Sequence, residues 1–259
     1  MRGAWRVARL AGVDLYVHWS FSLIGLWLVW LGLSGSLHVG RLNFIVLALF
    51  SLFGCVVLHE LGHAWMAGRL HVHVRSVTLL PFGGYVQIEL PPQRPLHELL
   101  IALGGPLVNF ALAAGLALSL LLLDPARLLI LLTAPHAVID GIFLRAAALQ
   151  TPAISLLLFL TFANATLFVF NLIPVLPLDG GRVLRALLAM WLPPWRATQL
   201  ALILGQLFAI FLISIALVLR SFGLLLLAIF VLVAGLPVLL NHRRLSRVRS
   251  GAGSDDPSR

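Results

Sequence analysis

Apolar residues run through this chain in long blocks that are separated by short polar connections. A run of about 20 apolar residues is long enough to cross the hydrocarbon layer of a bilayer as a helix. Six runs reach that length, and they cover residues 18–37, 43–67, 97–123, 153–173, 197–219 and 222–240. The pattern therefore predicts an all-α polytopic membrane protein with six transmembrane helices.

The composition agrees with a membrane location and excludes a soluble globular protein. Of the 259 residues, 61% are apolar and only 10% are charged, and the mean hydropathy is +1.04. A typical soluble domain carries about one-quarter charged residues. A seventh, weaker apolar segment at 128–143 is interrupted by Pro135, His136 and Asp140, so we expect it to form an interfacial loop or a short helix.

All 18 basic residues are arginines, and the connections between the six runs share them unevenly. Fourteen would lie on one side of the membrane and four on the other. Because positive residues are retained on the cytoplasmic side, both ends of the chain are expected in the cytoplasm, and the arginine usage favours a bacterial inner membrane. The arginines flank apolar runs instead of forming a basic face with interleaved aromatics, so no nucleic-acid partner is expected. Residues 1–240 are expected to form one membrane domain, and 241–259 a basic, disordered tail.

One connection has the pattern of a β-hairpin. Between the second and third predicted helices, residues 74–90 alternate in polarity after Gly84. Gly83 and Gly84 offer the positive-φ positions that a tight turn requires. Non-helical backbone at membrane depth is tolerated where it is buried in protein or lines a wet cavity. The sequence therefore predicts a membrane-associated β-hairpin at this place.

The second predicted helix carries the sequence HELGH at 59–63. Residues four apart in an α-helix lie about 40° apart around its axis, so His59 and His63 face the same way, with room for one ion between their imidazoles. Glu60 is displaced by about 100° and can reach a water on that ion without binding the ion itself. This is the arrangement of ligands and base in metalloproteases. The alternative is that both histidines bond to backbone groups and that Glu60 forms a salt bridge. This alternative is disfavoured, because three ionisable groups within hydrocarbon are costly without a bound partner.

A hydrolytic zinc site has a third protein ligand and keeps one position open for water. Seven of the nine acidic residues lie at helix ends, in connections or in the tail, which leaves Glu60 and Asp179. Asp179 is therefore the favoured third ligand. It lies in the sequence NLIPVLPLDGGR at 171–182, where two prolines prevent a continuous helix and two glycines allow a close turn after the carboxylate. The alternative is an ordinary cytoplasmic loop in which Asp179 caps a helix.

Together these motifs resemble those of the site-2-type intramembrane zinc metalloproteases. The resemblance rests on HELGH at 59–63 and NLIPVLPLDGGR at 171–182, and it is supported by PFGGYV at 81–86 and GGPLVN at 104–109. It covers about residues 12–240. The resemblance implies that the membrane domain is an intramembrane metalloprotease, in a compact form without an added peptide-binding or nucleotide-binding regulatory domain.

The same resemblance implies a role for each site residue. His59, His63 and Asp179 would bind a zinc ion as the cofactor. Glu60 would be the catalytic acid and base, and Asn171 would hold the scissile carbonyl or its oxyanion. The implied reaction is hydrolysis of a peptide bond in or near the transmembrane segment of a membrane protein, as in regulated intramembrane proteolysis.

A transmembrane substrate must unwind locally before attack, because a helix holds its carbonyl groups in internal hydrogen bonds. An exposed edge of the predicted hairpin can hold the unwound stretch by strand addition. We therefore expect substrate contacts at Gly83, Gly84, Tyr85, Val86 and Asn109. Close helix packing is an equally good explanation for Asn109, which lies near two adjacent glycines. The expected partners are a membrane-spanning protein substrate and the lipid bilayer.

Two other functions fit parts of the pattern. A divalent-metal transporter also carries paired histidines and a glutamate on a membrane helix, but it needs ligands along a path and often two related halves, whereas this chain has one cluster and no clear internal repeat. An inactive relative that binds membrane proteins is the second alternative, although every expected catalytic group is present.

Cys55, one turn before His59, is expected to fill space. His136 and Asp140, four apart, form a weaker candidate for a second metal pair.

Overall fold

The computed structural model describes residues 3–10, 13–35, 39–80, 83–88, 94–135, 151–226, 228–229 and 231–233. The chain divides into two compact units, and each has its own apolar core. The first unit contains Met1–Pro91 and Gly104–Phe170, and the second contains Pro92–Leu103 and Asn171–Arg259. The predicted tail and the pair His136 and Asp140 lie outside the described residues.

Among the residues that the structure describes, four helices are long and apolar enough to cross a bilayer. The chain is therefore an integral membrane protein built mostly of helices. The four helices are α2 (Val39–Arg69), α3 (Pro95–Leu123), α7 (Pro152–Asn171) and α9 (Pro194–Val218). Each coincides with one of the six apolar runs, so four of the six predicted spans have a matching helix among the described residues.

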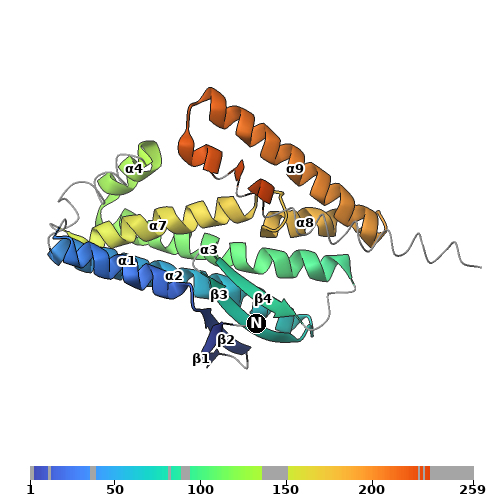
Figure 1. Ribbon diagram of the computed structural model, residues 1–259, viewed down its shortest axis with the longest axis horizontal. Helices are drawn as coiled ribbons and strands as arrows, with labels where there is room; N and C mark the ends of the chain where they lie inside the picture. Colours follow the sequence, from blue (N-terminus) through green and yellow to red (C-terminus); the bar gives the residue numbers. More distant parts are fainter. Residues whose placement is uncertain are drawn as a thin grey trace, which may run out of the picture. The chain divides into compact units, whose positions relative to one another are not determined.

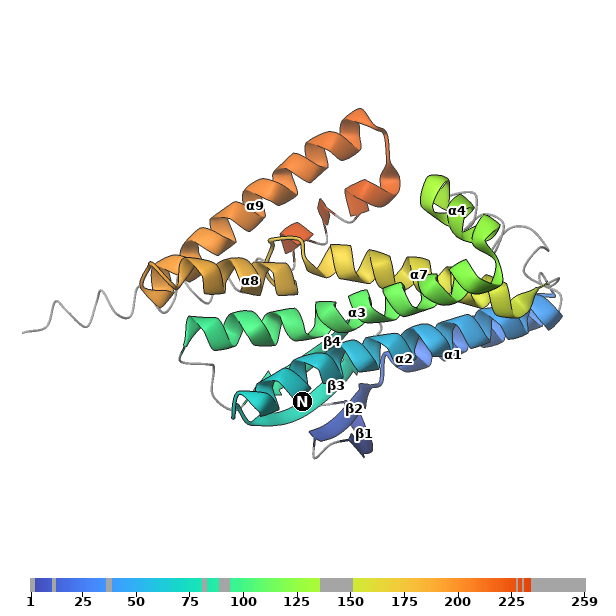
Figure 2. The same cartoon turned by 180° about the vertical axis from the view of Figure 1, so that it is seen from behind.

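The first predicted span is not a full transmembrane helix. Helix α1 (Phe21–Leu33) has 13 residues and is about 20 Å long at the usual rise per residue, which is shorter than the hydrocarbon layer. It begins at Phe21, after strand β2 (Val13–His18) and a short turn, and it ends at Leu33, four residues before the predicted end. Figures 1 and 2 show α1 alongside α2. The sixth run corresponds to a shorter apolar helix, Phe222–Val233, of which the structure describes only part. The prediction of six membrane-spanning helices is therefore not confirmed.

A four-stranded sheet accompanies the helices. The fold is mostly helical, and the prediction of an all-α fold with a single β-hairpin accounts for only part of this sheet. The strands β1 (Ala4–Leu10), β2, β3 (Val74–Leu80) and β4 (Gly83–Ile88) follow that order across the sheet. The outer pairs are antiparallel, and β2 pairs with β3 in parallel. The sequence analysis missed β1 and β2, although the alternation of Val13, Leu15 and Val17 with polar residues is a strand signal.

Strands β3 and β4 form the predicted hairpin between α2 and α3, but Gly83 and Gly84 do not form its turn. Gly83 pairs with Leu80, and Gly84 pairs with Leu79, so both glycines belong to β4. The expected role of Gly83 and Gly84 as turn residues is therefore wrong, because the ladder continues through both. Strands β3 and β4 lie against α2 (Figure 1), and the association of the hairpin with the membrane stays a prediction.

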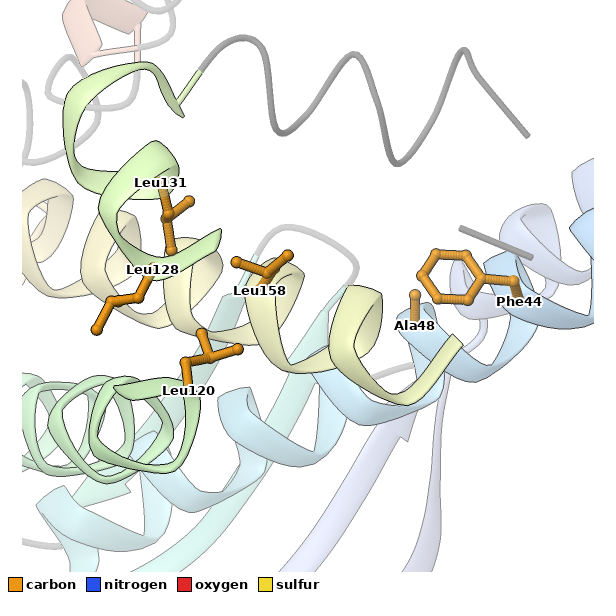
Figure 3. Packing of buried hydrophobic residues seen from close by; sticks show 6 residues of the cluster. All are labelled: Phe44, Ala48, Leu120, Leu128, Leu131 and Leu158. Atoms are coloured by element: carbon orange, nitrogen blue, oxygen red, sulfur yellow. The ribbon is translucent and has the colours of Figure 1, made fainter. Parts of the chain in front are cut away.

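The apolar core of the first unit lies where α4 (Pro125–Thr133) folds back on α3 and α7. The Asp124 side chain accepts a hydrogen bond from the backbone N–H of Arg127 (3.1 Å) and so caps α4. The helix buries Leu128 and Leu131, whereas Leu129, Ile130 and Leu132 are exposed. Figure 3 shows the buried cluster, which contains Phe44, Ala48, Leu120, Leu128, Leu131 and Leu158. Helix α4 thus confirms a short helix in the described part of the weak apolar segment.

The second unit is built around α8 (Asp179–Leu188) and α9. The loop before α8 contributes Val175 and Leu176 to two apolar clusters with α9. A partly buried ion pair also holds this unit together. Arg185 of α8 donates to the carboxylate of Glu98 in the first turn of α3, with an Nε–Oε1 distance of 2.8 Å. Glu98 is 5% exposed. Apolar contacts therefore hold the loop before α8, and an ionic contact holds its last turn.

Candidate metal centre

The HELGH sequence lies in the second half of α2, with both imidazoles buried. His59 is 6% exposed and His63 is 3% exposed. Their Nε2 atoms lie 3.2 Å apart, and their rings are nearly perpendicular at 86°. Two nitrogens that bind one tetrahedral zinc ion at about 2.0–2.1 Å lie about 3.3 Å apart. The pair therefore has the spacing of two nitrogen ligands of one metal ion.

The surroundings of the two histidines depend on an unusually close approach of α2 and α3. A Cβ added to Gly62 would lie 2.5 Å from the backbone oxygen of Gly104 and 2.7 Å from the Val108 side chain. A Cβ added to Gly104 would lie 2.7 Å from the backbone oxygen of Gly62. Small residues permit this approach in a membrane protein, where helix association depends on close van der Waals packing. The glycine inside HELGH is thus a packing requirement of the helix pair.

Helix α3 contacts both imidazoles at the ring nitrogens that face away from the pair. The backbone N–H of Gly105 donates to Nδ1 of His63 (3.3 Å). The side-chain amide of Asn109 lies 3.0 Å from Nδ1 of His59. Asn109 is fully buried. The structure thus places Asn109, which the sequence analysis associated with substrate or packing, directly against a candidate metal ligand.

Glu60 is buried on α2 and lies against the backbone of β4. It is 6% exposed. A Cβ added to Gly84 would come closer than 3.0 Å to three atoms of the Glu60 side chain. Gly84 is therefore needed for the position of the carboxylate, and β4 lies directly beside the expected acid and base. The side chains of Tyr85 and Val86 lie outside the described residues.

Asp179 lies in the second unit, as the first residue of α8. The helix N-cap is Leu178, whose side chain makes no capping bond, so the alternative reading of Asp179 as an N-cap is wrong. The Asp179 carboxylate is largely buried and lies 3.9 Å from the Arg182 guanidinium. Added Cβ atoms at Gly180 and Gly181 would collide with the backbone of residues 172–176, so both glycines allow the preceding loop, which contains a cis Leu176–Pro177 bond, to fold over the helix start.

Asn171 is the last residue of α7 and is partly buried. Gly83 and Gly84 are part of β4. The sequence analysis missed two further residues of the first unit, Gly62 and Gly105, whose lack of a side chain lets α3 reach the imidazoles. The adjacent glycines before Pro106 were a signal for close packing, but the sequence does not say which side chains they approach.

Comparisons with known proteins extend these observations. Residues 47–213 match the model of peptidase family M50. The zinc metalloprotease MJ0392 of Methanocaldococcus jannaschii is 29% identical over 243 residues, which are 94% of this chain and 60% of that protein. Rip3 of Mycobacterium tuberculosis is 36% identical over 201 residues, which are 73% of this chain and 44% of that protein.

A solved structure, that of a site-2 protease from Methanocaldococcus jannaschii, is similar in fold. It superimposes with a TM-score of 0.58 at 26% sequence identity, covering 90% of this chain and 93% of that one. The chain spans 60% of the length of MJ0392 and 44% of that of Rip3. The family match includes α7, α8 and the part of α2 that carries HELGH. This chain therefore belongs to peptidase family M50, the family of the site-2 proteases.

Proposed function

We propose that this protein is a zinc-dependent intramembrane endopeptidase that hydrolyses a peptide bond in or near the transmembrane segment of a membrane protein. The observation that carries the proposal is the buried pair His59 and His63 on a membrane-crossing helix, with Nε2 atoms 3.2 Å apart. Family membership supports the same activity, since relatives of this chain are named zinc metalloproteases and site-2 protease.

The zinc ligands in this proposal are His59, His63 and Asp179. Two imidazoles and one carboxylate form a donor set found in catalytic zinc sites, which keep a further position open for water. When bound, zinc supplies Lewis acidity and lowers the pKa of a bound water to about 7. The burial of Asp179 at the start of α8, and the fixed loop before it, support its role as the carboxylate ligand.

Two further side chains would act on the reacting groups. Glu60 accepts a proton from the attacking water and returns it to the leaving amine, as a general acid and base. Its burial against β4 holds the carboxylate in one place. Asn171 offers a side-chain N–H to the oxyanion that develops on the scissile carbonyl.

The edge strand β4 would hold the substrate. Among the strands that the structure describes, β4 pairs with β3 alone, so its other edge can pair with an extended peptide. Gly83, Gly84, Tyr85 and Val86 form the segment of β4 next to Glu60, which supports substrate binding at this segment. The hairpin would lie at membrane depth beside the buried site.

The polypeptide substrate would be cut near the cytoplasmic face of a bacterial inner membrane. The arginine distribution supports cytoplasmic ends for the chain, and HELGH lies in the second half of α2, which would run toward the cytoplasm. Residues 1–240 would form the protease domain, and 241–259 its tail.

The proposal is tested with wild-type protein and the variant Glu60→Gln in cell membranes. We expect at least one single-span membrane protein to remain uncut with the variant and to be cut with the wild type. Vesicles prepared from the same membranes are placed in a zinc solution, and the zinc that enters them is measured. Uptake that survives Glu60→Gln without any proteolysis would instead indicate a transporter, and unchanged membrane proteomes together with no uptake would indicate an inactive relative.

A further inference from the structure

Helix α3 engages both candidate zinc ligands in matching register. Gly105 and Asn109 are four residues apart, and so are His63 and His59, which they contact at 3.3 Å and 3.0 Å. Both contacts are made at Nδ1, whereas the two Nε2 atoms face each other. One face of α3 therefore contacts the Nδ1 atoms of both imidazoles.

This contact requires a glycine at position 105. A Cβ added to Gly105 would lie 2.7 Å from Nε2 and Cε1 of His59, and still closer to Nε2 of His63. The backbone of α3 therefore lies directly against both rings. Any displacement of α3 would change the distances at both Nδ1 atoms together.

The position of the proton on a metal-bound imidazole determines whether Asn109 must act as a hydrogen-bond donor or acceptor toward His59. A neutral imidazole that binds a metal through Nε2 carries its proton on Nδ1. In His59 that proton points at the Asn109 amide. A hydrogen-bond acceptor at this place fixes the tautomer and the orientation of the ring, which is the usual role of an outer partner of a metal-bound histidine.

Asn109 has such an acceptor without a partner. Its Oδ1 atom is buried and makes no hydrogen bond, while the nitrogen of the same amide faces Nδ1 of His59. A half-turn of the amide exchanges its nitrogen and oxygen at nearly the same positions. With the amide turned in this way, Oδ1 accepts the hydrogen bond from Nδ1–H, and the buried oxygen is satisfied.

We propose that Asn109 is a positioning residue for zinc binding. Its side-chain oxygen accepts a hydrogen bond from Nδ1–H of His59 and keeps the Nε2 lone pair of His59 directed at the ion. This inference rests on the proposed function, in which His59 binds zinc. It is confined to His59, because the partner of His63 Nδ1 is a backbone N–H, which donates only.

Asn164 offers a matched control. It is a second fully buried asparagine of the same unit, and its Oδ1 also lacks a hydrogen bond. Its nitrogen donates to the backbone oxygen of Leu160 (2.8 Å) and to Sγ of Cys55 (3.3 Å). The Leu160 carbonyl requires a donor, so this amide cannot be turned. Replacing Asn164 therefore removes a similar buried amide without touching a histidine.

The test measures zinc affinity of the full chain in detergent micelles, by competition with a chromophoric chelator. Asn109→Leu is expected to weaken zinc binding by about 10–100-fold. Asn109→Asp, which keeps an acceptor oxygen at the same position, is expected to bind zinc as well as the wild type does. Asn164→Leu is expected to leave the affinity unchanged. Asn109→Ser, whose side chain is too short to reach Nδ1, replaces Asn109→Leu if the latter does not fold.

Two results would overturn the inference. Wild-type zinc affinity in Asn109→Leu would show that the contact is unimportant for the ion, and an Asn109→Asp variant as weak as Asn109→Leu would show that the amide acts as a donor. Failure of the wild-type chain itself to bind zinc would refute the proposed function. The two failures are therefore distinguishable in one experiment.

Discussion

The side chain of Glu60 occupies the space in which the β-carbon of any larger residue at position 84 would lie. An added Cβ on Gly84 would come closer than 3.0 Å to Cγ, Cδ and Oε1 of Glu60. Gly84 lies within a β-ladder, paired with Leu79. The conformational freedom of glycine is therefore not required at this position. It is the lack of a side chain at Gly84 that lets the edge strand and the carboxylate lie together.

We expect Gly84→Ala to displace Glu60 or β4 and to lower peptide cleavage by about 100-fold, since a shift of about 1 Å in a catalytic group has an effect of that size. Zinc content should be unchanged, because the atoms nearest to a Cβ added at position 84 belong to Glu60 and not to a histidine. Cleavage of a single-span test substrate by the purified chain measures the effect. Gly115→Ala is the control, as no atom lies within 4 Å of a Cβ added there. Equal cleavage by both variants would refute the assigned role of Gly84.

The packing of α2 on α3 makes a prediction about stability. Gly62→Ala introduces a methyl group 2.5 Å from the backbone oxygen of Gly104, so the helices must separate. Overpacking of this kind costs about 1–3 kcal/mol, and we expect a lower midpoint of thermal unfolding in detergent. Gly54→Ala on the same helix, where an added Cβ meets nothing within 4 Å, should leave the midpoint unchanged or raise it. A Gly62→Ala protein as stable as Gly54→Ala would contradict the close crossing.

Substitutions of Glu98 and Arg185, which form an ion pair in the second unit, should have strongly coupled effects on the free energy of unfolding. Glu98 is almost completely buried, so removing its partner with Arg185→Met leaves a buried charge and should cost about 3 kcal/mol. The double variant with Glu98→Leu should recover part of this loss. Denaturant unfolding of the four proteins of the cycle measures the coupling energy, and additive losses would show that the pair is not coupled. Arg6→Met, which breaks an exposed pair with Asp14, should cost less than about 1 kcal/mol.

Metal analysis of variants should distinguish the residues that bind zinc from the residue that acts as general acid and base. A chelator is expected to abolish cleavage, and added zinc should restore it. His59→Ala should lose both zinc and cleavage, whereas Glu60→Gln should keep zinc and lower cleavage by at least about 100-fold. Metal analysis and cleavage of the same samples provide the measurement. Cys55→Ala, one turn before His59, should keep both properties, and a Glu60→Gln protein that still cleaves would exclude Glu60 as the acid and base.

Proline substitutions test whether β4 binds the substrate. Successive N–H groups of a strand point to opposite sides, so one of Tyr85→Pro and Val86→Pro removes an N–H that faces β3 and the other removes an outward one. We expect the outward variant to lose cleavage of a transmembrane substrate while its thermal unfolding midpoint stays near that of the wild type. Unchanged cleavage by both variants would exclude strand addition at this edge.

The local parts of this protein follow from its sequence. The spacing of His59 and His63 defines a shared helix face, and the long apolar runs define α2, α3, α7 and α9, because both properties depend only on neighbours along one helix. The weak segment was expected to form an interfacial loop or a short helix, and its described part forms helix α4. Family membership supports this interpretation, but the helix face of His59 and His63 and the membrane-crossing helices can be predicted without it.

Only the tertiary structure decided which distant residues meet. Strand β2 pairs with β3 across an interval that contains two helices, and this pairing joins the N-terminal strands to the predicted hairpin in one sheet. The partners of Gly84 and Asn109, namely Glu60 and His59, are likewise distant in sequence. Strand pairing and close contact depend on how separate elements approach, and the sequence of one element does not contain that information.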